Sequence, residues 1–386
     1  MPQSASPDPV VPAALVDHHG DDAPLPKTVV DSCPSPVPAT GSLIWADLLA
    51  LLMSGGYLTE DEASRVLMSF FTDEVPAPVV ASVLVLMRRR EESVDELVGF
   101  AKAMAAKMLV VPIDGEVLDT CGTGGDRHGT INVSTAAGLV ASAAGARVLK
   151  HGGRAASSKT GSADVLEHLG IDIELDPKGV AQMVQTSRFG FALATRFHPA
   201  MAAVAPVRRA LGIPTAFNFL GPLVNPGRAK YQLVGVFDRR LAPSMAEVLR
   251  AQGSEHALVV SGDDGMDEVS LSTPTMVWEV RKDREVTCYE ISPGDFGLPM
   301  ASLAELQGGD AAENADVLRA ILAGAITDAR RDLVALNAGA ALYAGDKVGS
   351  IAEGVACAME SLTSGQAGVY LDELVASQPL HKTREH

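Results

Sequence analysis

The chain takes on a regular pattern at Ser42, where apolar residues begin to recur at the spacing of one helix face. The same period continues through three further segments, and Thr59 with Glu62 forms a capping-box signature at the start of the second. The pattern therefore predicts a small, all-helical domain over 42–110. Its last three helices are expected over 60–71, 77–90 and 93–108.

Beyond Pro112 the pattern changes to short apolar runs that alternate with helical stretches. Strands are predicted over 116–119, 147–150, 232–237 and 257–261, and helices over 134–144 and 162–169, while 171–175, 178–186 and 190–195 continue the alternation. Such alternation favours a larger α/β domain over 111–386, with a mostly parallel central sheet covered by helices. One more helical stretch, 198–212, is apolar on one side and is expected to pack back on the helical domain.

The first 41 residues carry nine prolines and show no sustained period, which predicts a disordered extension outside the fold. The chain start lacks a basic segment followed by an apolar core, so no secretory signal is expected. No run reaches the roughly 18 apolar residues of a membrane span. We therefore expect a cytoplasmic protein with no membrane partner.

The formal charge of −17 argues against nucleic acid as a partner, because such binding rests on neutralising many phosphates. The four cysteines, Cys33, Cys121, Cys288 and Cys357, are scattered without metal-ligand spacing, which favours reduced thiols over disulfides or zinc. A small anionic ligand is compatible with this acidity only if cations and backbone amides converge on it locally.

A glycine-rich loop is the first candidate for such convergence. In Asp119-Thr-Cys-Gly-Thr-Gly-Gly-Asp126, three glycines follow a predicted strand and precede a helix. Glycines let backbone N–H groups approach an anion, and a helix N-terminus adds about half a positive charge. A tight turn would explain the same glycines, and the spacing matches neither the Walker A nor the dinucleotide-binding pattern. The Gly122–Asp126 loop is thus a candidate diphosphate cradle.

Two neighbouring segments add hydroxyls and cations. Asn132-Val-Ser-Thr135 opens the alanine-rich helix, and its hydroxyls can cap that helix or face a phosphate or its metal ion. Lys150-His-Gly-Gly-Arg154 ends a strand in a glycine turn and is followed by several serines. This second segment supplies the local positive charge that an anion site in an acidic protein needs.

An acidic segment completes the set. Adjacent carboxylates in Gly262-Asp-Asp-Gly-Met-Asp-Glu268 are hard oxygen ligands that suit Mg²⁺ bridging phosphate oxygens, although a solvated acidic turn would look the same. Three of the four segments lie at or near strand ends, where open α/β sheets bind ligands. Together they predict a site for a diphosphate with Mg²⁺.

These segments belong to a longer series of ordered blocks. The blocks are DTCGTGGD, INVST, KHGGRAASSKTGSADVLEHLGI, RFHPAM, VRRALGIPTAFNFLGPLVNP and MDEVS, with ENADVLRAILAG and LNAGAALYAGD near the end. With them, residues 42–376 resemble the anthranilate phosphoribosyltransferases, the tryptophan-pathway members of the nucleoside-phosphorylase-like transferases. The resemblance implies transfer of phosphoribose from phosphoribosyl pyrophosphate (PRPP) to the amine of anthranilate, with release of pyrophosphate. It also implies Mg²⁺, a hinge between the two domains and a homodimer.

The resemblance assigns roles to residues of this chain. PRPP would contact Gly122, Gly124, Gly125, Asp126, Thr130, Asn132, Ser134, Thr135, Lys150, Ser158 and Ser162. Anthranilate would contact Gly122, His151, Gly153, Arg208, Gly221 and Pro222, with Arg208 pairing with the carboxylate. Mg²⁺ would be held by Ser134, Asp267 and Glu268. No residue is expected to act as a dedicated acid or base.

One position departs from the family pattern. Where the family reads His-Gly-Asn-Arg, this chain has glycine at position 153, and the missing asparagine would contact the acceptor. This departure suggests weaker anthranilate binding or another aromatic acceptor in specialised metabolism. The same fold could also serve a pyrimidine nucleoside phosphorylase or an inactive relative that binds nucleic acid. The diphosphate segments oppose the first, and the charge and the retained Asp267-Glu268 pair oppose the second.

Overall fold

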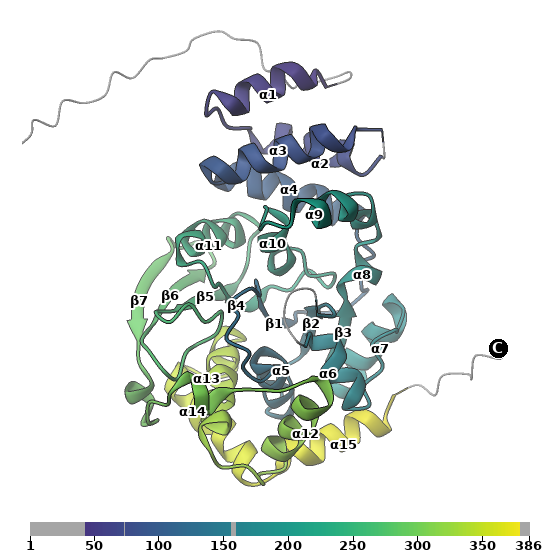
Figure 1. Ribbon diagram of the computed structural model, residues 1–386. Coiled ribbons are helices and arrows are strands. Elements are labelled where there is room, and N and C mark those ends of the chain that lie inside the picture. Colours follow the sequence, from purple (N-terminus) through teal and green to yellow (C-terminus); the bar gives the residue numbers. More distant parts are fainter. Residues whose placement is uncertain (1–42, 73, 156–159, 379–386) are drawn as a thin grey trace, which may run out of the picture. The chain divides into compact units, whose positions relative to one another are not determined.

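The computed structural model describes residues 43–72, 74–155 and 160–378 (Figure 1). The predicted extension over 1–41 and Ser158 of the candidate diphosphate site lie outside the described residues. Within the described ranges, no helix is long and apolar enough to cross a membrane.

The N-terminal part of the described chain is helical, as its apolar period predicts. Its helices are α1 (Trp45–Met53), α2 (Glu60–Phe70), α3 (Ala77–Arg90) and α4 (Val94–Lys107). The capping box at the start of α2 is formed, since the Thr59 N–H donates to the Glu62 carboxylate at 2.9 Å. α2 packs closely on α4 because Gly99 has no side chain, and a Cβ there would meet the Glu60 carbonyl at 2.2 Å.

The stretch over 198–212 is not one helix. It is divided into a 3-10 turn, η1 (Pro199–Ala202), and a short helix, α9 (Ala205–Leu211). A proline lies in the first turn of each, where its missing N–H is not needed, and each proline marks a new start. α9 contacts α3, and η1 contacts α4.

The α/β part is built on a seven-stranded sheet with the order β3-β2-β1-β4-β5-β6-β7. The strands are β1 (Leu118–Gly122), β2 (Val148–Gly152), β3 (Phe189–Leu193), β4 (Tyr231–Gly235), β5 (His256–Gly262), β6 (Thr275–Arg281) and β7 (Thr287–Ile291). Strands β1 to β5 pair with one another in parallel, whereas β6 pairs antiparallel with both β5 and β7. This pairing confirms the mostly parallel sheet. The chain runs outward from β1 to β3 and returns at β4 on the other side of β1, so the switch point lies between β1 and β4.

Helices cover both faces of the sheet, and its parallel strands are buried on both sides (Figure 1). Leu233 of β4 faces a core shared with α5 (Val133–Ala143) and α13 (Ala329–Ala344), whereas the next residue, Val234, faces a second core that includes the helical domain. The other helices are α6 (Ser162–His168), α7 (Pro177–Ser187), α8 (Ala194–Phe197), α10 (Phe217–Leu220), α11 (Ala242–Ala251), α12 (Ala311–Leu322), α14 (Ile351–Thr363) and α15 (Gln366–Ala376).

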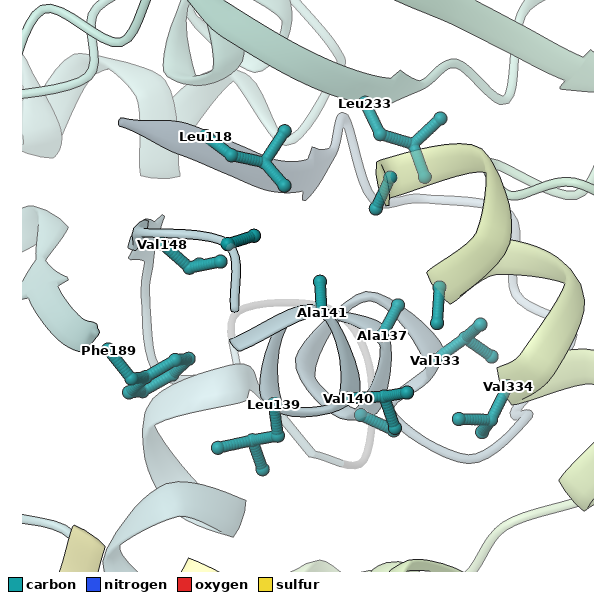
Figure 2. Packing of buried hydrophobic residues seen from close by; sticks show 14 of the residues in the cluster. Leu118, Val133, Ala137, Leu139, Val140, Ala141, Val148, Phe189, Leu233 and Val334 are labelled. Carbon is teal, nitrogen blue, oxygen red and sulfur yellow. The ribbon is translucent and has the colours of Figure 1, made fainter. Parts of the chain in front are cut away.

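Helix α5 packs closely under the sheet because residues that face the strands are small. Figure 2 shows Ala137 and Ala141 lying between the helix axis and the strands that carry Leu118 and Val148. A Cβ at Gly138 would meet the Thr120 hydroxyl at 2.8 Å. The helix that begins beside the glycine-rich loop is thus fixed closely against the strand that leads into it.

Residues 171–175 form no strand, although Ile171, Ile173 and Leu175 are all buried. The backbone N–H of Asp172 donates to the side chain of Gln378 rather than to a neighbouring strand. The segment is an extended connection between α6 and α7, and its alternating burial imitates the pattern of a strand.

A polar network ties the antiparallel edge of the sheet to α13. Burial alone would raise the pKa of Glu279, but hydrogen bonds from His256, Tyr289, Arg281 and Tyr343 overcome this effect and lower the pKa to about 2. The two tyrosine hydroxyls donate to the carboxylate at 2.8 and 3.0 Å. The ionised form of Glu279 is therefore the form that the fold stabilises.

Glu279→Gln is expected to lower the melting temperature at neutral pH. A carboxylate whose folded pKa lies below its ordinary value of 4.5 stabilises the fold above that pH, and the contribution is lost as the pH falls through about 2. The difference from the wild type should therefore shrink between pH 7 and pH 3. Circular dichroism melts across this range measure it, with the exposed Glu290→Gln as control. A difference of equal size at pH 3 would contradict the assignment.

Candidate active site

The two strands at the switch point end in glycines that lie side by side. Gly122 of β1 is in register with Gly235 of β4, and Asp267 packs over both. A Cβ at Gly122 would meet the Asp267 carboxylate at 2.3 Å, and one at Gly235 would meet its carbonyl oxygen at 1.6 Å. Only glycine at both strand ends allows the acidic segment to approach the glycine-rich loop.

The glycine-rich loop binds the Asp267 carboxylate through a backbone N–H. The N–H of Gly124 donates to Asp267 Oδ2 at 2.7 Å. Gly124 and Gly125 have φ angles of 66° and 95°, in the left-handed region that glycine adopts without strain. Arg127 has a φ of 59° in the same loop, where a side chain is strained. The loop thus takes up a conformation that directs a backbone N–H toward an anion.

The start of α5 lies beside the second carboxylate. The helix begins at Val133, so Ser134 and Thr135 lie inside it and cannot be its N-cap; the N-cap residue, Asn132, makes no side-chain capping bond. Instead, the Ser134 N–H donates to Glu268 Oε1 at 3.1 Å, which places a carboxyl group at the helix N-terminus. Thr135 is fully buried, and its hydroxyl has no partner within the described residues.

Lys150 joins the glycine loop to the helix start. Its side chain is 1% exposed, and Nζ donates to Ser134 Oγ at 3.0 Å and to the carbonyl of Thr120. Burial lowers the pKa of Lys150, and the nearby carboxylates of Asp119 and Glu268 oppose that shift. The ammonium is the cation that the sequence led us to expect at this end of β2.

Among the described residues, no cation lies within hydrogen-bond distance of the acidic pair. Burial and the neighbouring Asp126 raise the pKa of Asp267 to about 6, and burial with Asp267 raises the pKa of Glu268 well above its ordinary value. No group of three or more His, Cys, Asp or Glu side chains in the described ranges could hold a metal ion. Two carboxylates beside a hydroxyl nevertheless fit Mg²⁺, which commonly uses one or two carboxylates and takes its other ligands from phosphates and water.

A second polar cluster borders the loop. Asn132 Oδ1 accepts hydrogen bonds from Thr160 Oγ1 at 3.3 Å and from Asn314 Nδ2 at 2.8 Å. Thr130 pairs with Gln307 through an isolated bridge. Sequence reasoning missed Asn314, which lies some 180 residues from its partner and carries no local signal beyond its place in one of the family blocks.

The turn after β2 has its own ion pairs. Arg154 pairs with Asp164 at 3.0 Å and with Glu167 at 2.9 Å, so this arginine is already neutralised. Ser162 is the first residue of α6, and its neighbour Ala163 donates from N–H to the Gly153 carbonyl at 3.2 Å. A Cβ at Gly153 would meet no heavy atom of the described residues within 4 Å.

Two buried histidines form the candidate acceptor wall. His151 Nδ1–H donates to the Gly221 carbonyl at 3.1 Å, next to Pro222, and its ring lies 4.9 Å from that of His198. Burial lowers the pKa of His151 to about 3 and that of His198 to about 4, so both rings are neutral. Both Nε2 atoms are buried without a partner in the described part of the chain. His198 was given no role, although it lies in the family block RFHPAM, because a lone histidine carries no further local signal.

Arg208 of α9 is a half-buried cation without a counterion. Its guanidinium lies 5.3 Å from the centre of the Phe217 ring, and burial lowers its pKa. No carboxylate among the described residues pairs with it, whereas most half-buried arginines of this protein have such a partner. An uncompensated, partly desolvated guanidinium is suited to receive an anionic ligand.

Comparison with known proteins agrees with this geometry. Residues 46–108 match the helical bundle domain of a glycosyl transferase family, and residues 114–368 match the a/b domain of that family. The anthranilate phosphoribosyltransferase of Roseiflexus castenholzii is 46% identical over 336 residues, covering 87% of this chain and 99% of the relative. The chain belongs to the anthranilate phosphoribosyltransferase family. The family resemblance of the sequence blocks is thereby confirmed.

Further relatives show how closely the family fold is shared. The enzyme of Rubrobacter xylanophilus is 50% identical, covering 83% of this chain and 94% of its own. The crystal structure of the Thermus thermophilus enzyme has a TM-score of 0.81 at 42% identity and covers 86% of this chain and 98% of its own. A Saccharomyces cerevisiae enzyme in complex with PRPP and Mg has a TM-score of 0.79 at 29% identity, over the same shares of the two chains.

Proposed function

We propose that the protein transfers phosphoribose from PRPP to the amine of anthranilate, giving N-(5-phosphoribosyl)anthranilate and pyrophosphate in tryptophan biosynthesis. The observation that carries the proposal is the convergence at the switch point of a glycine loop, Lys150 and the Asp267-Glu268 pair. The family relationship supports the same activity. The relatives give no support to a different aromatic acceptor.

The donor side is suited to a sugar diphosphate. Backbone N–H groups of the Gly122–Asp126 loop and the N-terminus of α5 offer donors and a partial positive charge to the diphosphate oxygens. Lys150 adds a full charge beside Ser134. In this proposal Thr135 supports the helix start from within, since its side chain is fully buried.

Asp267, Glu268 and Ser134 would hold Mg²⁺ with the diphosphate. The hydrogen bond from the Ser134 N–H to Glu268 supports a shared role for these two residues. A bound Mg²⁺ would neutralise the negative charge that grows on the leaving pyrophosphate. The metal and the diphosphate would therefore each favour the binding of the other, because each supplies charge that the other lacks.

The chemistry itself needs little from acids or bases. The C1–O bond to pyrophosphate breaks while the C1–N bond to the anthranilate amine forms, and the amine then loses one proton to solvent. Fixed backbone donors stabilise the leaving oxygens, and losing one such donor costs roughly 3–4 kcal/mol in comparable enzymes. Holding the amine close to C1 supplies much of the remaining acceleration.

The acceptor side would bind anthranilate by its two substituents. Arg208 would pair with the carboxylate, and His151 Nε2, left as a bare acceptor by the Nδ1–H bond to Gly221, would accept an amine N–H. Neutral histidines suit this role, because a charged ring would repel the arginine and the developing sugar cation.

Mixing the protein with PRPP, Mg²⁺ and anthranilate tests the activity directly. Anthranilate fluorescence is expected to fall as the amine is substituted, and the fall should require all three components. Release of pyrophosphate in equal amount is the second readout. A protein that consumes neither substrate but splits thymidine or uridine with phosphate would sink the proposal.

Arg208→Gln is expected to raise the KM for anthranilate about 10- to 100-fold, because a hydrogen bond to a charged group is worth about 1.5–3 kcal/mol. The KM for PRPP should change little, since Arg208 lies on the acceptor side. Arg209→Gln, on the neighbouring exposed position of α9, is the matched control and should match the wild type. Equal changes in both KM values would place Arg208 elsewhere in the mechanism.

Gly153→Asn is expected to fold normally and to lower the KM for anthranilate about two- to tenfold. A Cβ at position 153 meets no heavy atom of the described residues within 4 Å, and one restored hydrogen bond is worth about 0.5–1.5 kcal/mol. Gly153→Ala, which fills the same space without an amide, is the control. A panel of aromatic acceptors assayed with both variants shows whether the glycine widens acceptor choice; identical profiles would remove any role for this position.

We further propose a cytoplasmic homodimer. Several large apolar side chains are exposed on α1, on α3 and in the turn between α1 and α2, namely Ile44, Met53, Tyr57 and Val85. Exposed apolar side chains gathered on one small domain favour association with a second copy. Light scattering coupled to gel filtration measures the mass, and a monomer at assay concentration would contradict this part.

A further inference from the structure

A cavity of about 640 Å³ lies at the end of the sheet away from the candidate active site. Lys230, directly before β4, and Ser254, two residues before β5, are part of its lining. The glycine that faces Asp267 is at the other end of β4, roughly 16 Å away at 3.3 Å per residue. None of the residues assigned above to PRPP, anthranilate or Mg²⁺ lines this cavity.

One wall of the cavity is apolar. Val98, Ala101, Ala105 and Met108 line it from α4 and its C-terminal end, and Leu223 lines it from the facing segment. The volume lies within the range of about 300–1,000 Å³ that is typical of small-molecule sites. A ligand with a compact hydrocarbon or aromatic body would fit against this wall.

The rim carries two cations that are not neutralised. Arg228 makes no side-chain hydrogen bond or ion pair with any described residue, and Lys230 Nζ donates only to the carbonyl of Gly253, at 2.8 Å. Lys102 also lines the cavity, but Glu60 neutralises it at 3.1 Å. In a chain of net charge −17, two free cations beside one cavity point to an acidic ligand group.

The backbone of Arg228 adds a second, independent observation. Its φ of 52° lies in the left-handed region that favours glycine, and the residue before it is a glycine. The side chain of Arg228 is exposed at the rim, so it can reach a ligand in the cavity without breaking an internal contact. We propose that this cavity binds a small amphipathic anion, with its acidic group on Arg228 and Lys230 and its apolar body against α4.

The polar lining connects this cavity to the acceptor wall. Gln232 Nε2 donates to the Pro222 carbonyl at 2.7 Å. Asn225 Nδ2 donates to Asp119 Oδ2 at 2.7 Å, and Asp119 Oδ1 accepts from the His151 N–H at 3.1 Å. A ligand that shifts either amide would move the residues that face anthranilate. This coupling rests on the proposed function, whereas the binding site does not.

Titration of the full chain with the fluorescent anion 8-anilinonaphthalene-1-sulfonate tests the site. We expect one saturable site per chain, and at least tenfold weaker binding when Arg228→Gly and Lys230→Ala are combined. Glycine suits the left-handed backbone, so this variant should keep the wild-type melting temperature. The control combines Lys282→Ala with Arg284→Ala, which removes two cations from the exposed β6–β7 turn and should leave binding unchanged.

Two more variants separate this cavity from the acceptor pocket. Ala105→Trp should block the probe by filling the apolar wall, and Arg208→Gln should bind it as the wild type does. Equal weakening in both double variants, or loss of binding in Arg208→Gln alone, would overturn the proposal. Saturating probe should also change the KM for anthranilate at least twofold in the wild type but not in the Arg228–Lys230 variant. A chain without transferase activity would refute the proposed function. The titration would still show whether the cavity beside α4 binds the anion.

Discussion

Asp267→Asn is expected to lower kcat/KM for PRPP by about 10²- to 10³-fold, the size of effect seen when one electrostatic contact to a developing anion is removed. The amide oxygen can still accept the Gly124 N–H, which Asp267 now binds at 2.7 Å, so the loop should keep its shape. What is lost is the negative charge that would hold Mg²⁺ against the diphosphate. Steady-state kinetics over a range of Mg²⁺ concentrations measure the effect.

The stability of the Asp267 variant separates loss of charge from loss of fold. Burial and the neighbouring Asp126 both raise the pKa of Asp267, so an uncharged side chain should leave the melting temperature equal to or above that of the wild type. Asp263→Asn, in the same segment but paired at the surface with Arg239 at 2.6 Å, is the matched control and should stay within about twofold in activity. Wild-type kinetics in the Asp267 variant at low Mg²⁺ would contradict the metal assignment.

Gly235→Ala is expected to damage both stability and activity. Its Cβ would lie 1.6 Å from the Asp267 carbonyl oxygen, which is a backbone atom and cannot rotate away. Overpacking of this kind costs about 1–3 kcal/mol, and a shift of about 1 Å in a catalytic group can cost about a hundredfold in rate. Melting curves and kinetics on the same preparation measure the two losses.

Gly294→Ala is the matched control for that substitution. A Cβ at position 294 meets no heavy atom of the described chain within 4 Å, and the φ of Gly294 lies outside the left-handed region. This variant should therefore be as stable and as active as the wild type. If both alanines are equally harmless, Asp267 does not depend on the close approach at Gly235.

The sequence was most informative where the chemistry is local. The glycine run after β1 and the capping box at Thr59 can be predicted because each depends on residues only a few positions apart. The expected capping by Ser134 was wrong for the opposite reason. The helix begins one residue earlier, at Val133, and the Ser134 hydroxyl accepts from Lys150, which is 16 positions away and becomes a neighbour only when the sheet forms.

Long-range partners account for the other differences. Residues 171–175 alternate like a strand, but the place beside β2 is taken by β3, and the Asp172 N–H donates to the side chain of Gln378 instead of to a strand. Neither His198 nor Asn314 was selected, because each acquires its place through the fold: one beside His151 and the other beside Asn132. The family resemblance supplied roles that spacing alone could not give.

The small residues of α5 restrict how this part of the protein can change over time. At Ala137, Ala141 and Gly138 every substitution other than alanine to glycine adds volume. Nearly all mutations at these positions therefore enlarge the side chain and destabilise the packing, even though none of these residues is assigned to a substrate. If residues along this helix are conserved, the reason would be their close packing against the sheet and not a role in catalysis.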